Sequence, residues 1–273
     1  MPVATVANPR LTPDRIARRA VSDVLRAVGA ICDDRDTSPK AVHNLRRSCR
    51  TAGAVLELVA DCVDSRAAAR LQKRLRKIRK CAGVVRDLDV HAELANQILA
   101  GTPEAEDMLE EIENRRPAAA EQLIELLEEI KPSRLKRLRS RLKPADDRDD
   151  RHARSRIDRR TARWIEKARA VLFRPLPGEH QLHALRIDLK RLRIALRTLE
   201  SLGVRATRRR QAIIAETARH LGRFHDLCTL REEIETTRPV SPEGRKRLLS
   251  RIRSEEAESV VHARNALRKL VSR

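Results

Sequence analysis

Residues 182–200 read LHALRIDLKRLRIALRTLE, and this stretch decides the fold. Its leucines recur at steps of three and four residues, so at about 100° per residue they lie along one face of a helix. The spacing predicts a helix over about 179–202 whose leucine face is buried against other helices. The apolar positions are Leu182, Leu185, Leu189, Leu192, Leu196 and Leu199.

A second stripe on this helix is basic and has the same spacing. Its centre lies roughly 110° around the helix from the leucines, so it points to the edge of the buried face. One interpretation of this stripe is that its Arg and Lys side chains simply face solvent. However, no acidic residue four positions away neutralises the row, and like charges at this spacing repel each other. A bound anion would relieve that repulsion, which favours an anion site. The members are His183, Arg186, Lys190, Arg193 and Arg197.

The pattern occurs twice in the chain. The segment 43–46 (HNLR) recurs as 183–186 (HALR), and 83–88 (GVVRDL) recurs as 222–227 (GRFHDL), at nearly the same offset. Two motifs in one order at one offset predict two halves of similar architecture, related by a pseudo-two-fold axis. We place the first half at 1–145 and the second at 146–273, joined by a linker around 143–150.

The two copies of the basic stripe differ in length. The first-half stripe contains His43, Arg46 and Arg50, and then it stops. Gly53 and Glu57 stand where the second copy has Arg193 and Arg197. We therefore expect the second half to bind an anion more strongly than the first.

Helices with short breaks account for the rest of the chain. Gly83 and Gly222 are predicted to end helices as left-handed caps, with Asp87 and Asp226 at the start of the following helices. There they would favour the exposed N–H groups or hold an arginine in place. Pro117 is predicted to divide an acidic stretch into two helices. The predicted helices cover about 13–32, 39–62, 66–82, 87–99, 104–129 in two parts, 151–173, 179–202, 205–221, 226–236 and 242–271.

The composition supports an all-α protein of two helical-bundle halves. The chain has 273 residues, of which 41% are hydrophobic, with two Phe, one Trp and no Tyr. Strands favour aromatic and β-branched residues, whereas helices tolerate Leu, Ala, Arg, Glu and Lys. No apolar run approaches the roughly 20 residues that span a bilayer, and MPVATVANPR lacks the features of a secretory signal. We therefore expect no membrane insertion.

The charge and the cysteines indicate the partner and the compartment. With 60 Lys and Arg against 39 Asp and Glu, the net charge of +21 predicts a polyanionic partner. The scarcity of aromatic residues argues against a platform that stacks single-stranded bases. Five scattered cysteines without a C-x-x-C pair favour a reducing cytoplasm over a disulfide framework or a zinc site.

Four segments resemble the CHAD family, the conserved histidine α-helical domain. They are 43–58 (HNLRRSCRTAGAVLEL), 75–90 (LRKIRKCAGVVRDLDV), 183–200 (HALRIDLKRLRIALRTLE) and 217–230 (TARHLGRFHDLCTL). The resemblance implies long helices in two pseudo-symmetric halves that bind inorganic polyphosphate on basic helices at their junction. It also implies an association with polyphosphate granules.

The resemblance also implies which residues contact the polymer. Three departures from the family pattern, at 51–53 (TAG), His225 and Cys228, put equal use of the two halves in doubt. The segment 111–115 (EIENR) lacks the Glu-x-Glu-x-Lys strand of triphosphate-tunnel domains, so we expect a stand-alone module. With Arg197 from the stripe, the predicted polyphosphate-binding residues are His43, Arg46, Arg50, Arg76, Lys80, Arg86, His183, Arg186, Lys190, Arg193, Arg197 and Arg219.

Three functions remain open on the sequence alone. The leading hypothesis is a non-catalytic polyphosphate-binding module without a metal or cofactor. The alternative is a non-specific nucleic-acid-binding protein, since phosphate contacts carry most of that affinity. A polyphosphate hydrolase or kinase would need a metal site or a phosphate loop, and no G-x-x-x-x-G-K-[ST] occurs. The carboxylates gather in 104–129, which we interpret as a solvated face, with a docking surface for a basic partner as the alternative.

Overall fold

The structure is a computed structural model that describes residues 11–98, 102–145, 178–201, 208–236 and 242–271, together with positions 155, 159, 162, 163 and 166. The predicted helix over 151–173 and most of the predicted linker lie outside these ranges. Within them the chain is all-α, as predicted, and contains no strand. The helices are α1 (Pro13–Cys32), α2 (Pro39–Leu58), α3 (Ser65–Ile98), α4 (Pro103–Ile130), α5 (Pro132–Ser140), α7 (Glu179–Ser201), α8 (Arg208–Thr236) and α9 (Pro242–Val271).

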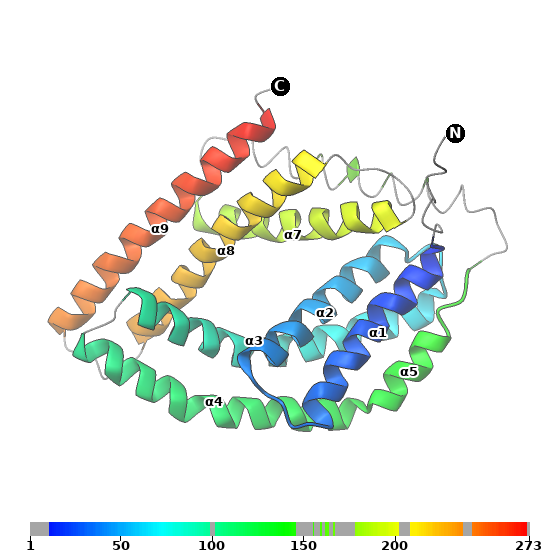
Figure 1. Cartoon of the computed structure of the whole chain (residues 1–273), viewed down its shortest axis with the longest axis horizontal. Helices are drawn as coiled ribbons and strands as arrows, with labels where there is room; N and C mark the ends of the chain where they lie inside the picture. Colours follow the sequence, from blue (N-terminus) through cyan, green and yellow to red (C-terminus); the bar gives the residue numbers. More distant parts are fainter. Residues whose placement is uncertain are drawn as a thin grey trace, which may run out of the picture.

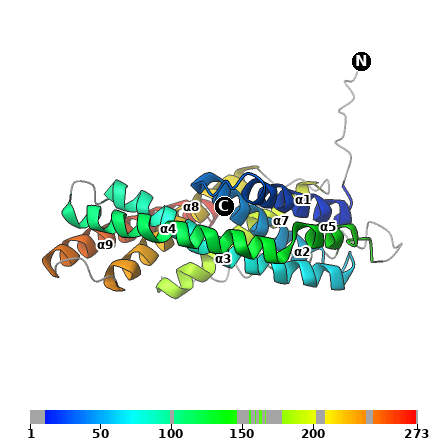
Figure 2. The same cartoon turned by 90° about the horizontal axis from the view of Figure 1, so that it is seen from below.

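The long helices of the two halves lie side by side. In Figure 1, α4 follows the lower edge, α8 and α9 lie on the left, α7 lies above, and α1, α2 and α5 lie on the right. The two halves meet where α2 contacts α7 and where α3 contacts α8. Seen from below, the molecule is long and flat (Figure 2). No helix in the described ranges is long and apolar enough to cross a membrane.

The predicted helix starts are confirmed, and so is most of the predicted leucine face, since Leu196 is partly buried and the Leu199 side chain lies outside the described part of the chain. Thr12 and Ser38 precede the prolines that open α1 and α2, and the Ser38 Oγ accepts a hydrogen bond from the Ala41 backbone N–H at 3.3 Å. Leu185 and Leu189 of α7 are almost fully buried. The first-half equivalents are buried as well, namely Val42, Leu45, Cys49, Ala52, Leu56 and Val59.

Two apolar clusters form the core. The smaller one joins α7, α8 and α9. The larger one spans α1 to α5 and also takes in residues of α7, α8 and α9. The first-half core therefore continues under the second half, which fixes the α2–α7 and α3–α8 contacts. The second-half members of the larger cluster are Ala195, Leu227, Leu230, Ile234, Leu248 and Ile252. The division at 145/146 stays a prediction.

The predicted helix ends at Gly83 and Gly222 are wrong. Both glycines lie inside continuous helices, α3 and α8. The apolar stripe explains this, because Leu75, Ile78, Ala82 and Val85 are buried at steps of three and four residues across Gly83. A glycine in a helix interior costs about 1 kcal/mol relative to alanine, which burial on both sides outweighs.

The predicted break at Pro117 is wrong for the same reason. Pro117 lies within the single helix α4. A proline here removes one backbone hydrogen bond, yet Ile112 before it and Ala120 after it are both buried on the same side. The neighbouring Arg116 further holds this turn of α4, since its Nε donates to Asp89 of α3 at 2.7 Å.

Candidate functional site

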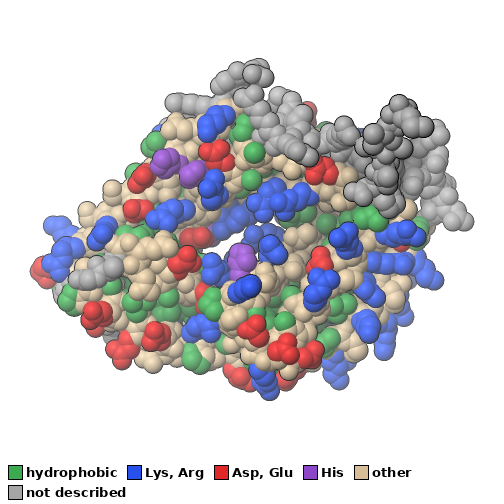
Figure 3. All heavy atoms as spheres, in the orientation of Figure 1, with side chains coloured by type: hydrophobic (Ala, Val, Ile, Leu, Met, Phe, Trp, Pro, Cys, Tyr) green, Lys and Arg blue, Asp and Glu red, His purple; other side chains and the backbone are tan. Residues whose placement is uncertain are grey.

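A cavity of about 1400 Å³ lies between the two halves. Residues of α1, α2, α3, α7 and α8 line it, whereas no residue of α4, α5 or α9 does. Figure 3 shows the hollow near the centre of this face with Lys and Arg side chains gathered around it, while acidic side chains lie along the lower edge over α4. The helices of the repeat therefore converge on a basic cavity.

Nine of the twelve predicted binding residues line this cavity. Arg76 and Lys80 do not line it, and both are exposed on α3. They share a helical face with Asp87. In the continuous helix α3, however, Arg76 lies about 16 Å and Lys80 about 10 Å from Asp87 along the axis, toward the start of the helix. His183 is not a lining residue either. The nine are His43, Arg46, Arg50, Arg86, Arg186, Lys190, Arg193, Arg197 and Arg219.

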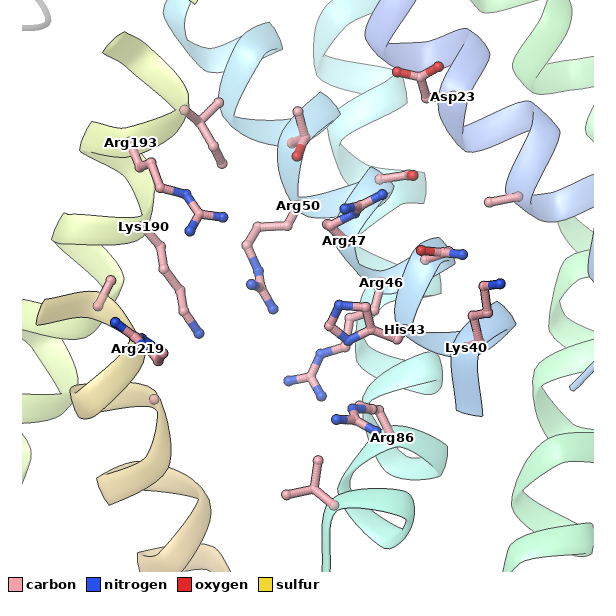
Figure 4. A pocket seen from close by; sticks show the side chains of 18 of the residues that line it. Asp23, Lys40, His43, Arg46, Arg47, Arg50, Arg86, Lys190, Arg193 and Arg219 are labelled. Carbon is pink, nitrogen blue, oxygen red and sulfur yellow. The ribbon is translucent and has the colours of Figure 1, made fainter. Parts of the chain in front are cut away.

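Arg50 and Lys190 are the most confined of the free cations. They project into the cavity from the facing helices α2 and α7 (Figure 4). Neither forms an ion pair with a described carboxylate. Burial lowers the pKa of Lys190 to about 7, assisted by the positive charges of Arg186 and Arg50. Burial likewise lowers the pKa of Arg50 to about 10, assisted by Arg46 and Arg186.

Arg46 and Arg186, in contrast, are each paired with an aspartate. The Arg46 Nη1 donates to the Asp87 Oδ1 at 2.7 Å, and the Arg186 Nη2 lies 3.5 Å from the Asp226 Oδ1. The two pairs occupy matching positions of the repeat. Asp87 and Asp226 thus hold stripe arginines in place, as one prediction stated, but they do so from helix interiors rather than from helix starts.

Histidines of the motif lie at the edge of the cavity. His225, which stands where the family pattern has an arginine, lines it, and His183 approaches it with 3.1 Å between the two Nδ1 atoms. Burial lowers the pKa of His225 to about 3, with further contributions from Arg186 and His183. Burial and Arg86 also lower the pKa of His43. The histidines therefore act as neutral hydrogen-bonding groups near neutral pH.

Several further cations, outside the predicted binding residues, line the cavity. Arg47 follows Arg46 directly, and Lys40 stands at the start of α2 (Figure 4). Arg19 and Arg26 belong to α1 at a seven-residue spacing that places them on one face. That helical spacing was a usable signal. What the sequence lacked was any sign that α1 borders the cavity.

The acidic helix α4 stands apart from the cavity. Some of its carboxylates pair with neighbouring cations, for example Glu129 with Lys77 at 2.9 Å and Glu121 with Arg35 at 3.5 Å. Across the described parts of the chain, no group of three or more His, Cys, Asp or Glu side chains is arranged to hold a metal ion. All five cysteines are free thiols.

Comparison with known proteins identifies the family. Two solved structures share the fold, PptA from Streptomyces chartreusis and the CHAD domain from the plant Ricinus communis. The first has a TM-score of 0.68 and 18% identity, covering 96% of this chain and 99% of the other. The second has a TM-score of 0.66 and 20% identity, covering 93% and 90%. No curated protein matches the sequence. The CHAD domain family matches residues 15–235, and the chain belongs to this family.

Proposed function

We propose that this protein binds inorganic polyphosphate in the cavity between its two halves. The observation that carries the proposal is a set of confined cations, contributed by facing helices, that lack a carboxylate partner among the described residues. A flexible polymer with about one charge per phosphate is the complement of such a set, because it can follow the cavity and meet each cation in turn. The set consists of Arg50, Lys190 and Arg193, whose side chains are partly buried.

The shape of the site favours a single phosphate strand over duplex DNA. The cations face inward between α2 and α7, whereas a duplex about 20 Å across needs an open basic face. Among the described residues, the cavity lining also contains no Phe, Trp or Tyr on which exposed bases would stack. Nucleic acid would therefore reach only the cations at the rim.

We propose binding without turnover. Phosphoanhydride chemistry needs carboxylates that hold a metal ion or activate water. Asp87 and Asp226 are instead engaged with arginines. The protein would thus store, protect or recruit polyphosphate, and we place it at polyphosphate granules in the cytoplasm.

A competition series tests the proposal. The protein is loaded with labelled long-chain polyphosphate, and four competitors are tested for their ability to displace it: pyrophosphate, short polyphosphate, long polyphosphate and duplex DNA. All are compared at the same total phosphate concentration and the same salt concentration. We expect affinity to rise with chain length and to level off once both halves are spanned, because each added contact becomes intramolecular. If DNA competes as well as long polyphosphate, non-specific nucleic-acid binding replaces polyphosphate binding as the proposed function. Loss of long-chain polyphosphate in the presence of Mg²⁺ would instead indicate an enzyme.

A further inference from the structure

Two aspartates stand in the middle of a site built for anions. Asp87 and Asp226 line the same cavity as the unpaired cations, and each contacts the arginine of one His-x-x-Arg motif. A carboxylate beside a bound phosphate chain repels it, so a site selected only for affinity would omit both. Their presence in both copies of the repeat points to a role in binding.

The contacts that hold the two arginines are incomplete. A guanidinium has five N–H donors, yet Asp87 takes a single contact from Arg46, and Asp226 lies near one nitrogen of Arg186. The Nε atoms of Arg46 and Arg186 are both buried and have no hydrogen-bond partner among the described residues. The charge of each guanidinium is therefore balanced, but some of its N–H donors have no acceptor. A phosphate with several acceptor oxygens can offer the guanidinium more contacts than the aspartate does.

A glycine lies one helical turn before each aspartate and on the same helix face, Gly83 before Asp87 and Gly222 before Asp226. A Cβ atom at Gly83 would lie 3.8 Å from the Arg46 Cζ, which is ordinary van der Waals contact, whereas a Cβ atom at Gly222 would meet nothing within 4 Å. The Arg46 guanidinium therefore lies close against α3 at Gly83, and the second copy has no equivalent contact at Gly222.

We propose that Asp87 and Asp226 are internal counter-ions that are exchanged for phosphate when the polymer binds. This inference rests on the proposed function. In the free protein they balance Arg46 and Arg186 amid crowded positive charge. On binding, phosphate oxygens take over the two guanidinium groups, and the aspartates are left facing solvent or the other cations. The aspartates thus set the affinity of the cavity and keep binding reversible.

The salt dependence of binding distinguishes this exchange from a purely structural role. A phosphate chain carries condensed counter-ions, and each phosphate that a protein cation neutralises releases them, with about 0.7 units of salt slope per phosphate for a single strand. Asp87 and Asp226 stay in the cavity when the polymer binds, so in wild type their two charges reduce by two the number of phosphates that the site neutralises. Replacing both aspartates by asparagine makes the full charge of Arg46 and Arg186 available to the polymer. The slope of log affinity against log salt should become steeper by about 1.4.

The experiment compares wild type, Asp87→Asn and Asp87→Asn/Asp226→Asn in titrations with long-chain polyphosphate across a series of salt concentrations. We expect the affinity at low salt to rise about 5- to 10-fold for each substitution and the slope to steepen with each. The Asp87 side chain is 53% exposed, so the single variant tests the inference even if the double variant does not fold. Circular dichroism checks the fold of each protein.

Asp23→Asn is the matched control. Asp23 lines the same cavity and lies 3.2 Å from Arg26, whose side chain is 79% exposed, whereas the Arg46 side chain is 24% exposed. Because Arg26 is already hydrated, Asp23→Asn should change the affinity less than twofold. It should change the slope of log affinity against log salt by less than about 0.3. An equal gain in the control would show a general charge effect and overturn the inference. A loss of affinity in Asp87→Asn would show that Asp87 only positions Arg46, which overturns it too.

The outcome separates this inference from the proposed function. If wild-type protein fails to bind long-chain polyphosphate at low salt, the proposed function fails. If wild type binds and the aspartate variants keep its affinity and slope, the counter-ion role alone is wrong.

Discussion

Arg50 of α2 and Lys190 of α7 share one confined space, although they belong to different halves of the chain (Figure 4). Neither forms an ion pair with a described carboxylate. The charge of Arg50 helps to lower the pKa of Lys190, and the charge of Lys190 helps to lower the pKa of His225. The free protein therefore stores electrostatic repulsion at the junction. An anion that enters the junction relieves that repulsion, and the first prediction follows from this coupling.

Binding of polyphosphate should be linked to proton uptake by Lys190. Its pKa is lowered to about 7 in the free protein, so at pH 8 to 9 this lysine is mostly neutral. A bound phosphate chain stabilises the ammonium form, so affinity should rise as pH falls from 9 to 7, by up to about tenfold per pH unit for one proton. Calorimetry at pH 8 in buffers of different ionisation enthalpy measures the uptake.

Lys190→Met should remove this pH dependence, whereas Lys40→Met, which removes an exposed lysine from the same cavity, should preserve it. The free protein gives an independent sign check. Because the folded-state pKa of Lys190 lies below its unfolded value, wild type should gain stability as pH rises above about 7, and Lys190→Met should flatten that gain. A persistent pH slope in Lys190→Met would assign the linkage to another group.

The second prediction concerns the longer basic stripe of α7. Arg193→Gln combined with Arg197→Gln should weaken binding of long polyphosphate by about tenfold or more, since each charge-assisted contact contributes about 1 kcal/mol. The control is Arg134→Gln with Arg137→Gln, which removes the same charge from α5, outside the cavity. Equal losses in fluorescence titrations of the two variants would mean that only net charge matters.

Most of the fold could be predicted from the sequence, because the apolar stripes encode helices and the repeat encodes two related halves. The continuity of α3 and α8 could not be predicted, since a glycine followed by an aspartate is also typical of a helix end. Only the packing on both sides of Gly83 decides between the two. Likewise, a stripe shows which face is basic but not where along the axis the partner helix crosses. The family resemblance groups Arg86 with Arg76 and Lys80, yet only Arg86 lines the cavity.

The third prediction tests this placement. Arg76→Gln combined with Lys80→Gln should change polyphosphate affinity less than twofold at moderate salt, because neither residue lines the cavity. The comparison is Arg50→Gln alone, which should lower the affinity more than the double variant although it removes less charge. A larger loss in Arg76→Gln/Lys80→Gln would extend the binding path along the outside of α3.

The fourth prediction concerns Pro117, which is exposed in the interior of α4. Pro117→Ala restores the missing backbone N–H and removes the clash with the preceding turn, so it should stabilise the protein by about 1 to 3 kcal/mol. Thermal and urea denaturation measure the change. A loss of stability would show that α4 needs a local bend at this point, and polyphosphate affinity should be unchanged in either case.

The last prediction concerns the clamp that holds the start of α2, and with it His43 and Arg46. Arg116 of α4 donates from Nε to the Asp89 Oδ1 at 2.7 Å and from Nη2 to the Thr37 carbonyl oxygen at 2.6 Å. The Asp89 side chain is only 2% exposed. It therefore depends on Arg116 to balance its charge.

Arg116→Ala should destabilise the fold by about 3 to 5 kcal/mol, because removing one partner leaves a buried charge uncompensated. Arg116→Ala/Asp89→Asn should recover part of that loss, since the second change removes the stranded charge while keeping its size. Arg26→Ala is the control, because the Arg26 side chain is 79% exposed and pairs with Asp23 at 3.2 Å. It should cost about 1 kcal/mol or less. If the double variant is no more stable than Arg116→Ala by urea denaturation, the contact with Thr37 rather than the charge of Asp89 accounts for the stability of the clamp.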